Sequence, residues 1–148
     1  ELLGVPLEDR KKFFEWTNTM IFADDPDMSI SEEEGQLAAL EVIQYALNLA
    51  AQHRKSPMDN ITGALLDAKL DGGPISEDMF GWMFILILVG GNESTRTVIA
   101  QGMRLLMEHP DQLQYLVDNP DKIGNACEEI LRYNTAFISM RRTATADT

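Results

Sequence analysis

The chain has 148 residues, of which 45% are hydrophobic, 10 are glycine and 6 are proline, a composition typical of a globular domain with a substantial core. Its 12 basic and 24 acidic side chains give a formal net charge of -12, which disfavours binding to nucleic acid or to an anionic membrane surface. The single cysteine of these 148 residues, Cys127, cannot form an intramolecular disulfide or a thiolate metal cluster with another cysteine among them, and none of their stretches has the composition of a signal segment. We therefore expect a reducing, cytoplasmic setting and no nucleic-acid partner.

Three helices are predicted in the first half of the chain. Pro6 and the acidic residues after it open a helix whose apolar residues recur at helical spacing as far as Phe22. The acidic, proline-containing residues 22–30 predict an exposed loop. Ser31 can cap a second helix that ends at residues 53–55, and Asp59 can cap a third that residues 71–74 break. The apolar face of the second helix is predicted at Leu37, Leu40, Ile43, Leu47 and Ala50.

The second half of the chain predicts a long helix and two shorter ones. Ser76 can cap a helix that runs to His109, because Pro110 cannot continue it. Pro110 and Pro120 suit the first positions of two further helices, the last ending near Tyr133, and residues 136–140 suit a β element. The apolar run 79–89 is shorter than the about 20 residues that cross a membrane, so we expect a buried helix and no membrane span.

The ends of the chain predict a piece of a larger protein. The sequence starts without a methionine and stops just after a strand-like run that ends near residue 145. No sequence repeat or low-complexity segment divides it. We therefore expect residues 1–148 to form a single partial domain of the all-α class.

Two consecutive glycines, Gly90 and Gly91, interrupt the predicted long helix at its centre, where glycine weakens a helix. Glycine lets another group approach the backbone closely, and the adjoining Glu93 and Ser94 could handle protons in an apolar cleft. Packing of another helix against small residues would explain the same composition equally well. Composition alone leaves both interpretations open.

Residues 89–96 (VGGNESTR) resemble the oxygen-activating signature of the central helix of cytochromes P450, small-Gly-any-acid-Thr. Gly90 matches the small position, Gly91 the glycine, Glu93 the acid and Ser94 the alcohol. The family usually has threonine at the last position, and Ser94 lacks the methyl group that restricts the rotamer. The resemblance implies that Glu93 and Ser94 are catalytic, as a proton relay, and that Gly90 and Gly91 border the haem.

Two more motifs extend the resemblance. Glu129 and Arg132 match the family's Glu-x-x-Arg motif, a structural pair that locks the haem-binding core, although the spacing alone predicts only an ordinary pair on one helix face. Arg142, five residues before Asp147, is similar to the arginine that binds a haem propionate, a role that suits the bidentate guanidinium. The usual proline after the motif is replaced by Ala136.

The resemblance covers essentially the whole chain, since the LLGVP run at 2–6 and the HPDQ junction at 109–112 also match the family. It implies a partial P450 fold and a haem-dependent monooxygenase that activates O2 and hydroxylates or epoxidises an apolar small molecule, such as a terpene, a steroid or an alkyl chain. The cofactor would be haem b, and the electron donor a ferredoxin or a flavoprotein reductase. Loop 22–30 would act as a lid, and the substrate pocket would be lined by Leu86, Val89, Gly90, Phe137, Ile138 and Met140.

No residue of this chain is expected to bind a metal. Cys127 lies two residues before Glu129, whereas the family's iron-ligand cysteine belongs to a Phe-Gly-rich loop further along than Thr148, so Cys127 is interpreted as a small buried hydrophobe. His53 and His109 lie at predicted helix ends, where contacts with the helix dipole or solvent are expected. The iron-ligand loop and the N-terminal part of the catalytic domain would then be absent, and this piece alone would be inactive.

Two other functions remain open. A non-catalytic helical binding or scaffolding domain is compatible with 148 residues that hold no iron ligand. A Phe-x-x-Gly-x-x-x-Cys loop further along the parent reading frame would support the enzyme, whereas a native stop after Thr148 would favour the binding or scaffolding domain. A haem-thiolate peroxygenase that uses peroxide is favoured by a lost relay alcohol, and the serine at position 94 leaves that alternative open.

Overall fold

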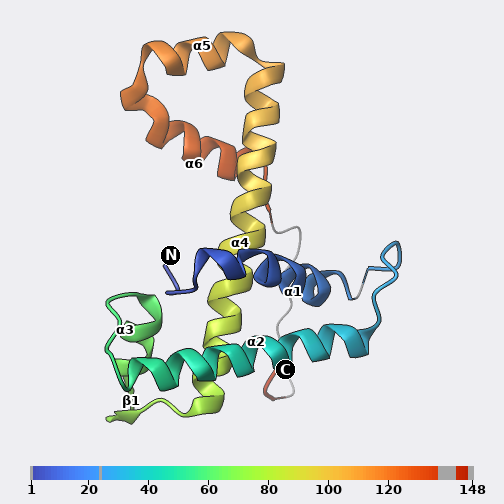
Figure 1. Ribbon diagram of the computed structural model, residues 1–148. Coiled ribbons are helices and arrows are strands. Elements are labelled where there is room, and N and C mark those ends of the chain that lie inside the picture. The colour runs from blue at the N-terminus through green and yellow to red at the C-terminus, as the bar shows by residue number, and fades with distance from the viewer. Residues whose placement is uncertain (1, 24, 137–142, 147–148) are drawn as a thin grey trace. The chain divides into compact units, whose positions relative to one another are not determined.

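The computed structural model describes residues 2–23, 25–136 and 143–146, which form α-helices with short connections and one small hairpin (Figure 1). This confirms the predicted all-helical class. Contacts between residues divide the chain into two compact units, Glu1–Val89 and Gly90–Thr148, and each is described by itself. The expectation of a single partial domain stays a prediction. In the described residues, no helix is both long enough and apolar enough to cross a membrane.

The first unit begins with a 3-10 turn, η1 (Leu7–Asp9), that leads into α1 (Arg10–Phe22). Phe13, Trp16 and Thr17 are buried on one face of α1, as their helical spacing predicts. The Thr17 hydroxyl donates a hydrogen bond of 2.9 Å to the Phe13 carbonyl, which satisfies a buried polar group inside its own helix. The apolar face of α1 is therefore free to pack against α2.

The helix α2 (Glu32–His53) begins at a capping box. The Ser31 hydroxyl accepts a hydrogen bond of 3.2 Å from the Glu34 backbone N–H, and the Glu34 carboxylate accepts one of 2.7 Å from the Ser31 N–H. The hydrogen bonds with Ser31 lower the pKa of the Glu34 carboxyl group, and the bond from the Ser31 backbone N–H contributes most. The sequence predicted this cap correctly.

The predicted apolar face of α2 is wrong at two positions, because Leu37 and Leu40 are each 60% exposed. The buried face consists largely of small residues, namely Gly35, Ala38, Val42, Ala46, Leu49 and Ala50. A Cβ added to Gly35 would lie 2.7 Å from the Ala23 Cβ, so the two segments approach very closely there. Where two helices approach this closely, only small side chains fit between them, whereas the sequence analysis assigned the buried face to the large apolar residues.

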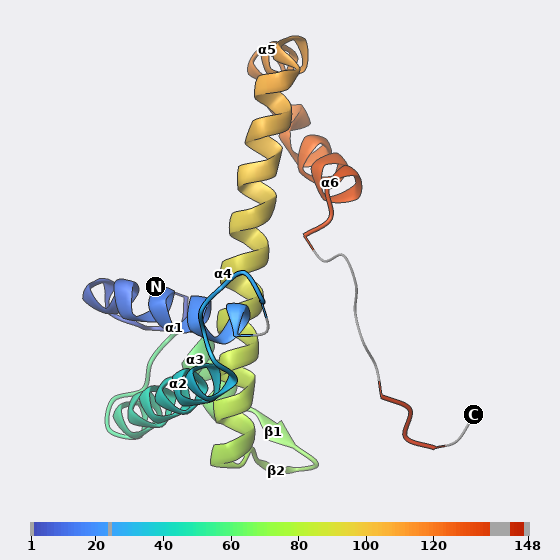
Figure 2. The same cartoon turned by 90° about the vertical axis from the view of Figure 1, so that its right-hand side faces the viewer.

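The helices α1 and α2 lie side by side and run in opposite directions (Figures 1 and 2). The Trp16 indole N–H of α1 donates a hydrogen bond to Glu41 of α2, and the Tyr45 hydroxyl of α2 donates one of 2.6 Å to Asp9, the residue that precedes α1. The Lys12 ammonium lies 4.5 Å from the centre of the Trp16 ring. Burial, together with the bond to Asp9, raises the pKa of Tyr45 well above its ordinary range.

The third helix, α3 (Ile61–Asp67), begins one residue later than predicted, because its cap is Asn60 and not Asp59. The Asn60 side-chain oxygen accepts a hydrogen bond of 2.9 Å from the Gly63 N–H. A hairpin of β1 (Lys69–Leu70) and β2 (Gly73–Pro74) follows, in antiparallel register with Lys69 opposite Pro74. Its turn uses positive φ angles of 51° at Asp71 and 83° at Gly72, which suits the expected turn.

The long helix α4 (Glu77–Glu108) supplies the rest of the first unit's core with its early turns. The Ser76 hydroxyl accepts a hydrogen bond of 3.1 Å from the Met79 N–H, which confirms the predicted cap. Phe80 and Phe84 are completely or almost completely buried, and the Phe84 ring centre lies 6.4 Å from that of Phe13. The buried hydrophobic core of this unit consists of Phe13, Trp16, Ala38, Val42, Ala46, Leu49, Ala50, Phe80, Phe84 and Leu88.

The second unit contains the later turns of α4, then α5 (Pro110–Asp118), a 3-10 turn η2 (Pro120–Lys122) and α6 (Ile123–Tyr133). Pro110 occupies the first turn of α5 as predicted, whereas Pro120 begins the 3-10 turn that precedes α6. α6 returns beside α4, where a Cβ added to Gly102 would lie 3.0 Å from the Ile130 side chain (Figure 1). The predicted β element at 136–140 falls largely on residues 137–142, outside the described part of the chain.

Candidate functional site

The candidate site lies on α4, which continues as a regular helix through Gly90 and Gly91. A Cβ added to either glycine would meet no atom of the described residues within 4 Å. The alternative interpretation, packing of another helix on these two glycines, is therefore not seen in the described part of the chain. The backbone at this point is open to approach by another group.

Ser94 bonds to the turn of α4 that carries the glycines. Its hydroxyl donates a hydrogen bond of 2.5 Å to the carbonyl oxygen of Gly90, four residues earlier. The hydroxyl proton is thus held along the helix, and the lone pairs of the oxygen remain available to accept a bond. A proton relay through Ser94 would have to pass a proton into this oxygen as well as out of it.

Glu93 forms an ion pair with Arg96, and the two side chains are 25% and 40% exposed respectively. Each residue of an α-helix is turned by about 100° from the last, so Arg96 lies about 60° to one side of Glu93 and Ser94 about 100° to the other. The pair consequently draws the Glu93 carboxylate away from Ser94. The two residues that the sequence assigned to a relay are neighbours in the chain, but their side chains are directed differently.

Leu86 lies on an exposed apolar stripe of α4. Met79, Trp82 and Leu86 are 41%, 61% and 71% exposed, and helical spacing carries the same stripe on to Gly90. Val89 is half-buried beside this stripe. The predicted pocket residues on α4 thus present apolar surface, while Phe137, Ile138 and Met140 lie outside the described residues.

The predicted pair on α6 is formed. The Arg132 guanidinium donates two hydrogen bonds to the Glu129 carboxylate, at 2.7 Å from Nε and 2.6 Å from Nη2. This pairing lowers the pKa of Glu129 and raises that of Arg132. The side chains are 60% and 68% exposed, so in the described residues the pair is a surface pair rather than a buried lock. Arg142, the expected partner of a haem propionate, is not described.

No family model matches the chain. In sequence it is 42% identical over 149 residues to the steroid C26-monooxygenase of Rhodococcus jostii RHA1, covering 100% of this chain and 30% of that protein. It is 33% identical to the methyl-branched lipid omega-hydroxylase of Mycobacterium bovis, covering 99% of this chain and 35% of that protein.

Among solved structures, the chain matches the cytochrome P450 PksS of the bacillaene polyketide synthase of Bacillus subtilis 168, with a TM-score of 0.79 and 32% identity. The match covers 89% of this chain and 33% of PksS. The chain belongs to the cytochrome P450 family. It spans about a third of the length of these P450 relatives.

Cytochromes P450 hold haem iron through a cysteine thiolate. In this P450 chain Cys127 is exposed on α6, so its interpretation as a buried hydrophobe is wrong. Among the described residues, no cluster of three or more His, Cys, Asp or Glu side chains could hold a metal ion. At Gly90 and Gly91, the described residues leave room for another group to approach the α4 backbone.

Sequence reasoning missed an apolar groove in the second unit of this P450 chain. Its volume is about 480 Å³ and it runs between the later turns of α4 and α6. It is lined by Ser94, Thr95, Val98, Ile99, Gly102, Met103, Leu106, Cys127, Ile130, Leu131, Thr135 and Ala136. The apolar residues at 98, 99, 102, 103 and 106 have helical spacing, a signal that could have predicted this face.

Proposed function

We propose that the protein to which this chain belongs is a haem-dependent monooxygenase that hydroxylates an apolar lipid, with α4 forming a wall of the pocket for substrate and O2. The observation that carries the proposal is the sequence of features along α4: the exposed stripe at Leu86, the open glycines, and the Ser94 hydroxyl bonded to Gly90. The sequence similarity to a steroid monooxygenase and to a branched-lipid hydroxylase supports this proposal.

Haem held by a thiolate would supply the chemistry that inserts one oxygen atom of O2 into a C–H bond, or into a double bond where the substrate offers one. The residues of this chain would bind the haem and orient the substrate. Gly90 and Gly91 would let a flat group and the substrate approach the α4 backbone, because a Cβ added there would meet no atom of the described residues within 4 Å. Leu86 and Val89 would exclude water from the substrate's side of the pocket. Phe137, Ile138 and Met140 would close the opposite side, and Arg142 would bind a haem propionate.

Proton delivery would use two side chains. Ser94 Oγ would leave the Gly90 carbonyl, accept a proton from the solvent side and pass its own proton into the pocket. Glu93 would exchange protons with solvent, and to reach Ser94 its carboxylate has to leave Arg96. The serine therefore acts as the last proton donor and the glutamate as the link to water.

The substrate class follows from the apolar stripe and from the relatives. A steroid and a methyl-branched lipid, the classes named for the two relatives, both offer a largely saturated apolar skeleton. Binding of such a skeleton over Trp82 and Leu86 would remove these exposed side chains from water, which stabilises the complex. The electron donor would be a ferredoxin or a flavoprotein reductase, in the cytoplasm.

The test uses the complete protein that carries this chain. We expect stoichiometric haem, the long-wavelength Soret band of a reduced carbonyl complex with thiolate ligation, and hydroxylated product from a steroid or a methyl-branched fatty acid in the presence of a ferredoxin or flavoprotein donor. Absence of haem would favour a non-catalytic binding or scaffolding domain. Equally fast turnover with peroxide and no electron donor would favour a peroxygenase.

A further inference from the structure

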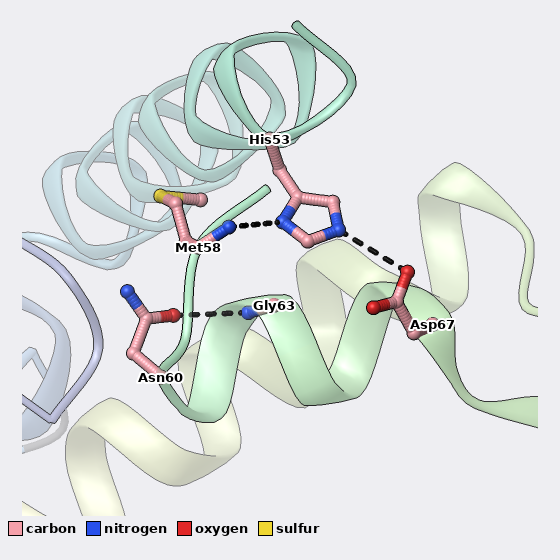
Figure 3. A network of polar contacts seen from close by, with 5 residues as sticks. All are labelled: His53, Met58, Asn60, Gly63 and Asp67. Carbon is pink, nitrogen blue, oxygen red and sulfur yellow. Dashed lines mark hydrogen bonds and ion pairs between the residues drawn. The ribbon is translucent and has the colours of Figure 1, made fainter. Parts of the chain in front are cut away.

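His53, at the C-terminal end of α2, is 8% exposed and uses both ring nitrogens (Figure 3). Nδ1 accepts a hydrogen bond of 3.0 Å from the backbone N–H of Met58, and Nε2 lies 3.2 Å from the Asp67 carboxylate. A backbone N–H can only donate, so Nδ1 must carry no proton. Nε2 must carry one to donate to the carboxylate. The neutral Nε2–H tautomer is the form that satisfies both contacts.

The bond to Met58 holds the connection between α2 and α3 against the first turn of α3. A Cβ added to Gly63 would lie 1.9 Å from the Met58 carbonyl oxygen and 3.2 Å from the His53 ring, so these backbones are in tight contact. The same turn anchors the start of the chain, because the Ile61 N–H donates to the Leu2 carbonyl at 3.0 Å. The completely buried Thr62 hydroxyl donates to the Leu3 carbonyl at 2.7 Å.

A second proton on the His53 ring would turn Nδ1 from an acceptor into a donor that faces the Met58 N–H. The bond would be lost and two N–H groups would oppose each other in a largely buried place. On α3, Asp67 favours the charged ring, but its side chain is 75% exposed and its charge is screened by water. Arg54, the residue that caps the C-terminal end of α2, is paired with Glu77 of α4 at 2.8 Å, while Lys55 and Asp59 of the connection are exposed.

We propose that His53 is a proton-sensitive clasp, which closes the α2–α3 connection in its neutral form and releases it when the ring takes up a second proton. Release frees the first turn of α3 and, through Ile61 and Thr62, the start of the chain. The clasp is intact while the ring is neutral and is lost when the pH is lowered enough for the ring to take up its second proton. This inference does not depend on the monooxygenase activity.

Amide hydrogen exchange of the full-length protein, corrected for the intrinsic rate at each pH, tests the clasp. We expect the protection of the Met58 amide to fall about fivefold between about pH 8 and about pH 5.5, the change that loss of one net hydrogen bond gives. The Ile61 amide should follow in the same direction. The Ala46 amide, in the buried middle of α2, should keep its protection.

Two variants assign the effect to the ring. His53→Asn keeps an oxygen acceptor near the position of Nδ1 and cannot take up a proton, so Met58 protection should no longer depend on pH. Asp67→Asn keeps the imidazole, so the pH dependence should persist. The proposal is overturned by flat Met58 protection in the unmodified protein, by the same pH dependence in His53→Asn, by its loss in Asp67→Asn, or by an equal fall at Ala46.

Discussion

At the residue scale, the hydrogen bond from Ser94 to the Gly90 carbonyl connects the proposed chemistry to the shape of α4. The bond fixes the hydroxyl oxygen beside two glycines whose Cβ positions have no atom of the described residues within 4 Å. It also competes with any other use of the hydroxyl proton, because that proton is shared with one acceptor at a time. The relay proposed for Ser94 thus depends on how often its hydroxyl leaves the Gly90 carbonyl and donates its hydrogen bond into the pocket instead.

Replacing Ser94 by alanine in the complete protein should separate electron consumption from product formation. We expect nearly unchanged substrate affinity, at least about tenfold less product per reducing equivalent, and a matching rise in hydrogen peroxide, because the positioned proton donor is lost. Ser94→Thr is the matched control. It should be coupled at least as well as the parent, since the added methyl group restricts the rotamer. An unchanged product ratio in Ser94→Ala would show that the hydroxyl serves only the helix.

Replacing Glu93 by glutamine should slow turnover and enlarge the solvent isotope effect, because the amide cannot carry protons from water to Ser94. The measurement is the turnover rate in light and heavy water at saturating substrate. Glu108→Gln is a suitable control, because Glu108 is also paired with an arginine of α4, Arg104, at 2.7 Å. Equal isotope effects in the two variants would argue against a special role of Glu93.

At the element scale, the close contacts of the helices decide which small residues are required. Gly63 of α3 lies against the Met58 carbonyl, whereas Gly124 of α6 has no atom of the described residues within 4 Å of an added Cβ. Both glycines lie inside helices. At Gly63, the packing contact opposes alanine, although alanine favours the helix. At Gly124, no contact of the described residues opposes it, so the two glycines form a matched pair.

Gly63→Ala should destabilise the protein by about 1–3 kcal/mol, the usual cost of overpacking a tight contact. Gly124→Ala should stabilise it by up to about 1 kcal/mol, because alanine has the higher helix propensity. Urea unfolding followed by circular dichroism measures both changes. Equal effects in the two variants would show that the contact between Gly63 and Met58 is not present in solution.

The pair on α6 leads to another prediction at this scale. In the complete protein, Glu129→Ala and Arg132→Ala should each lower the haem content per protein, because the proposed role of the pair is to hold the haem-binding core. The lowered pKa of Glu129 means that its share of the stability is present above the ordinary glutamate pKa and is lost as the pH falls through the folded value.

Haem content and melting temperature measure the effect of this pair. Arg104→Ala, which breaks the exposed pair with Glu108 on α4, should change neither quantity noticeably. Full haem content in both Glu129→Ala and Arg132→Ala would mean that the pair is a surface feature in the complete protein, as it is in the described residues.

The positions of helix ends could be predicted well from the sequence, because they depend on local chemistry. Ser31, Ser76 and Pro110 each mark a helix start where expected. The buried face of α2 could not be predicted in the same way. Which face is buried depends on the partner helix, and the tight approach at Gly35 favours small residues over Leu37 and Leu40.

The candidate site was predicted as a set of positions on α4, but its internal geometry was not. Residue types suggested that Glu93 and Ser94 act together, while the structure directs the first toward Arg96 and the second toward Gly90. Such choices depend on rotamers and on neighbouring acceptors, which a motif does not encode. The exposure of Cys127 was missed for a related reason, since helical spacing alone does not show which groove a face borders.

At the scale of the whole molecule, the chain spans about a third of the P450 relatives and carries large apolar side chains on its surface. Leu37, Leu40, Trp82 and Leu86 are each at least 60% exposed. Apolar surface of this extent is commonly covered by further chain, by a partner or by a ligand. On α4, the proposed function assigns the stripe at Trp82 and Leu86 to the substrate.

The central claim is that the complete protein inserts an oxygen atom from O2 into an apolar substrate. Turnover of a steroid or a methyl-branched fatty acid under oxygen gas labelled with oxygen-18, with an electron donor and with catalase to remove peroxide, tests this claim most directly. We predict that mass spectrometry finds one labelled oxygen atom in each hydroxylated product molecule. Products without the label, or no product from a protein with full haem content, would contradict it.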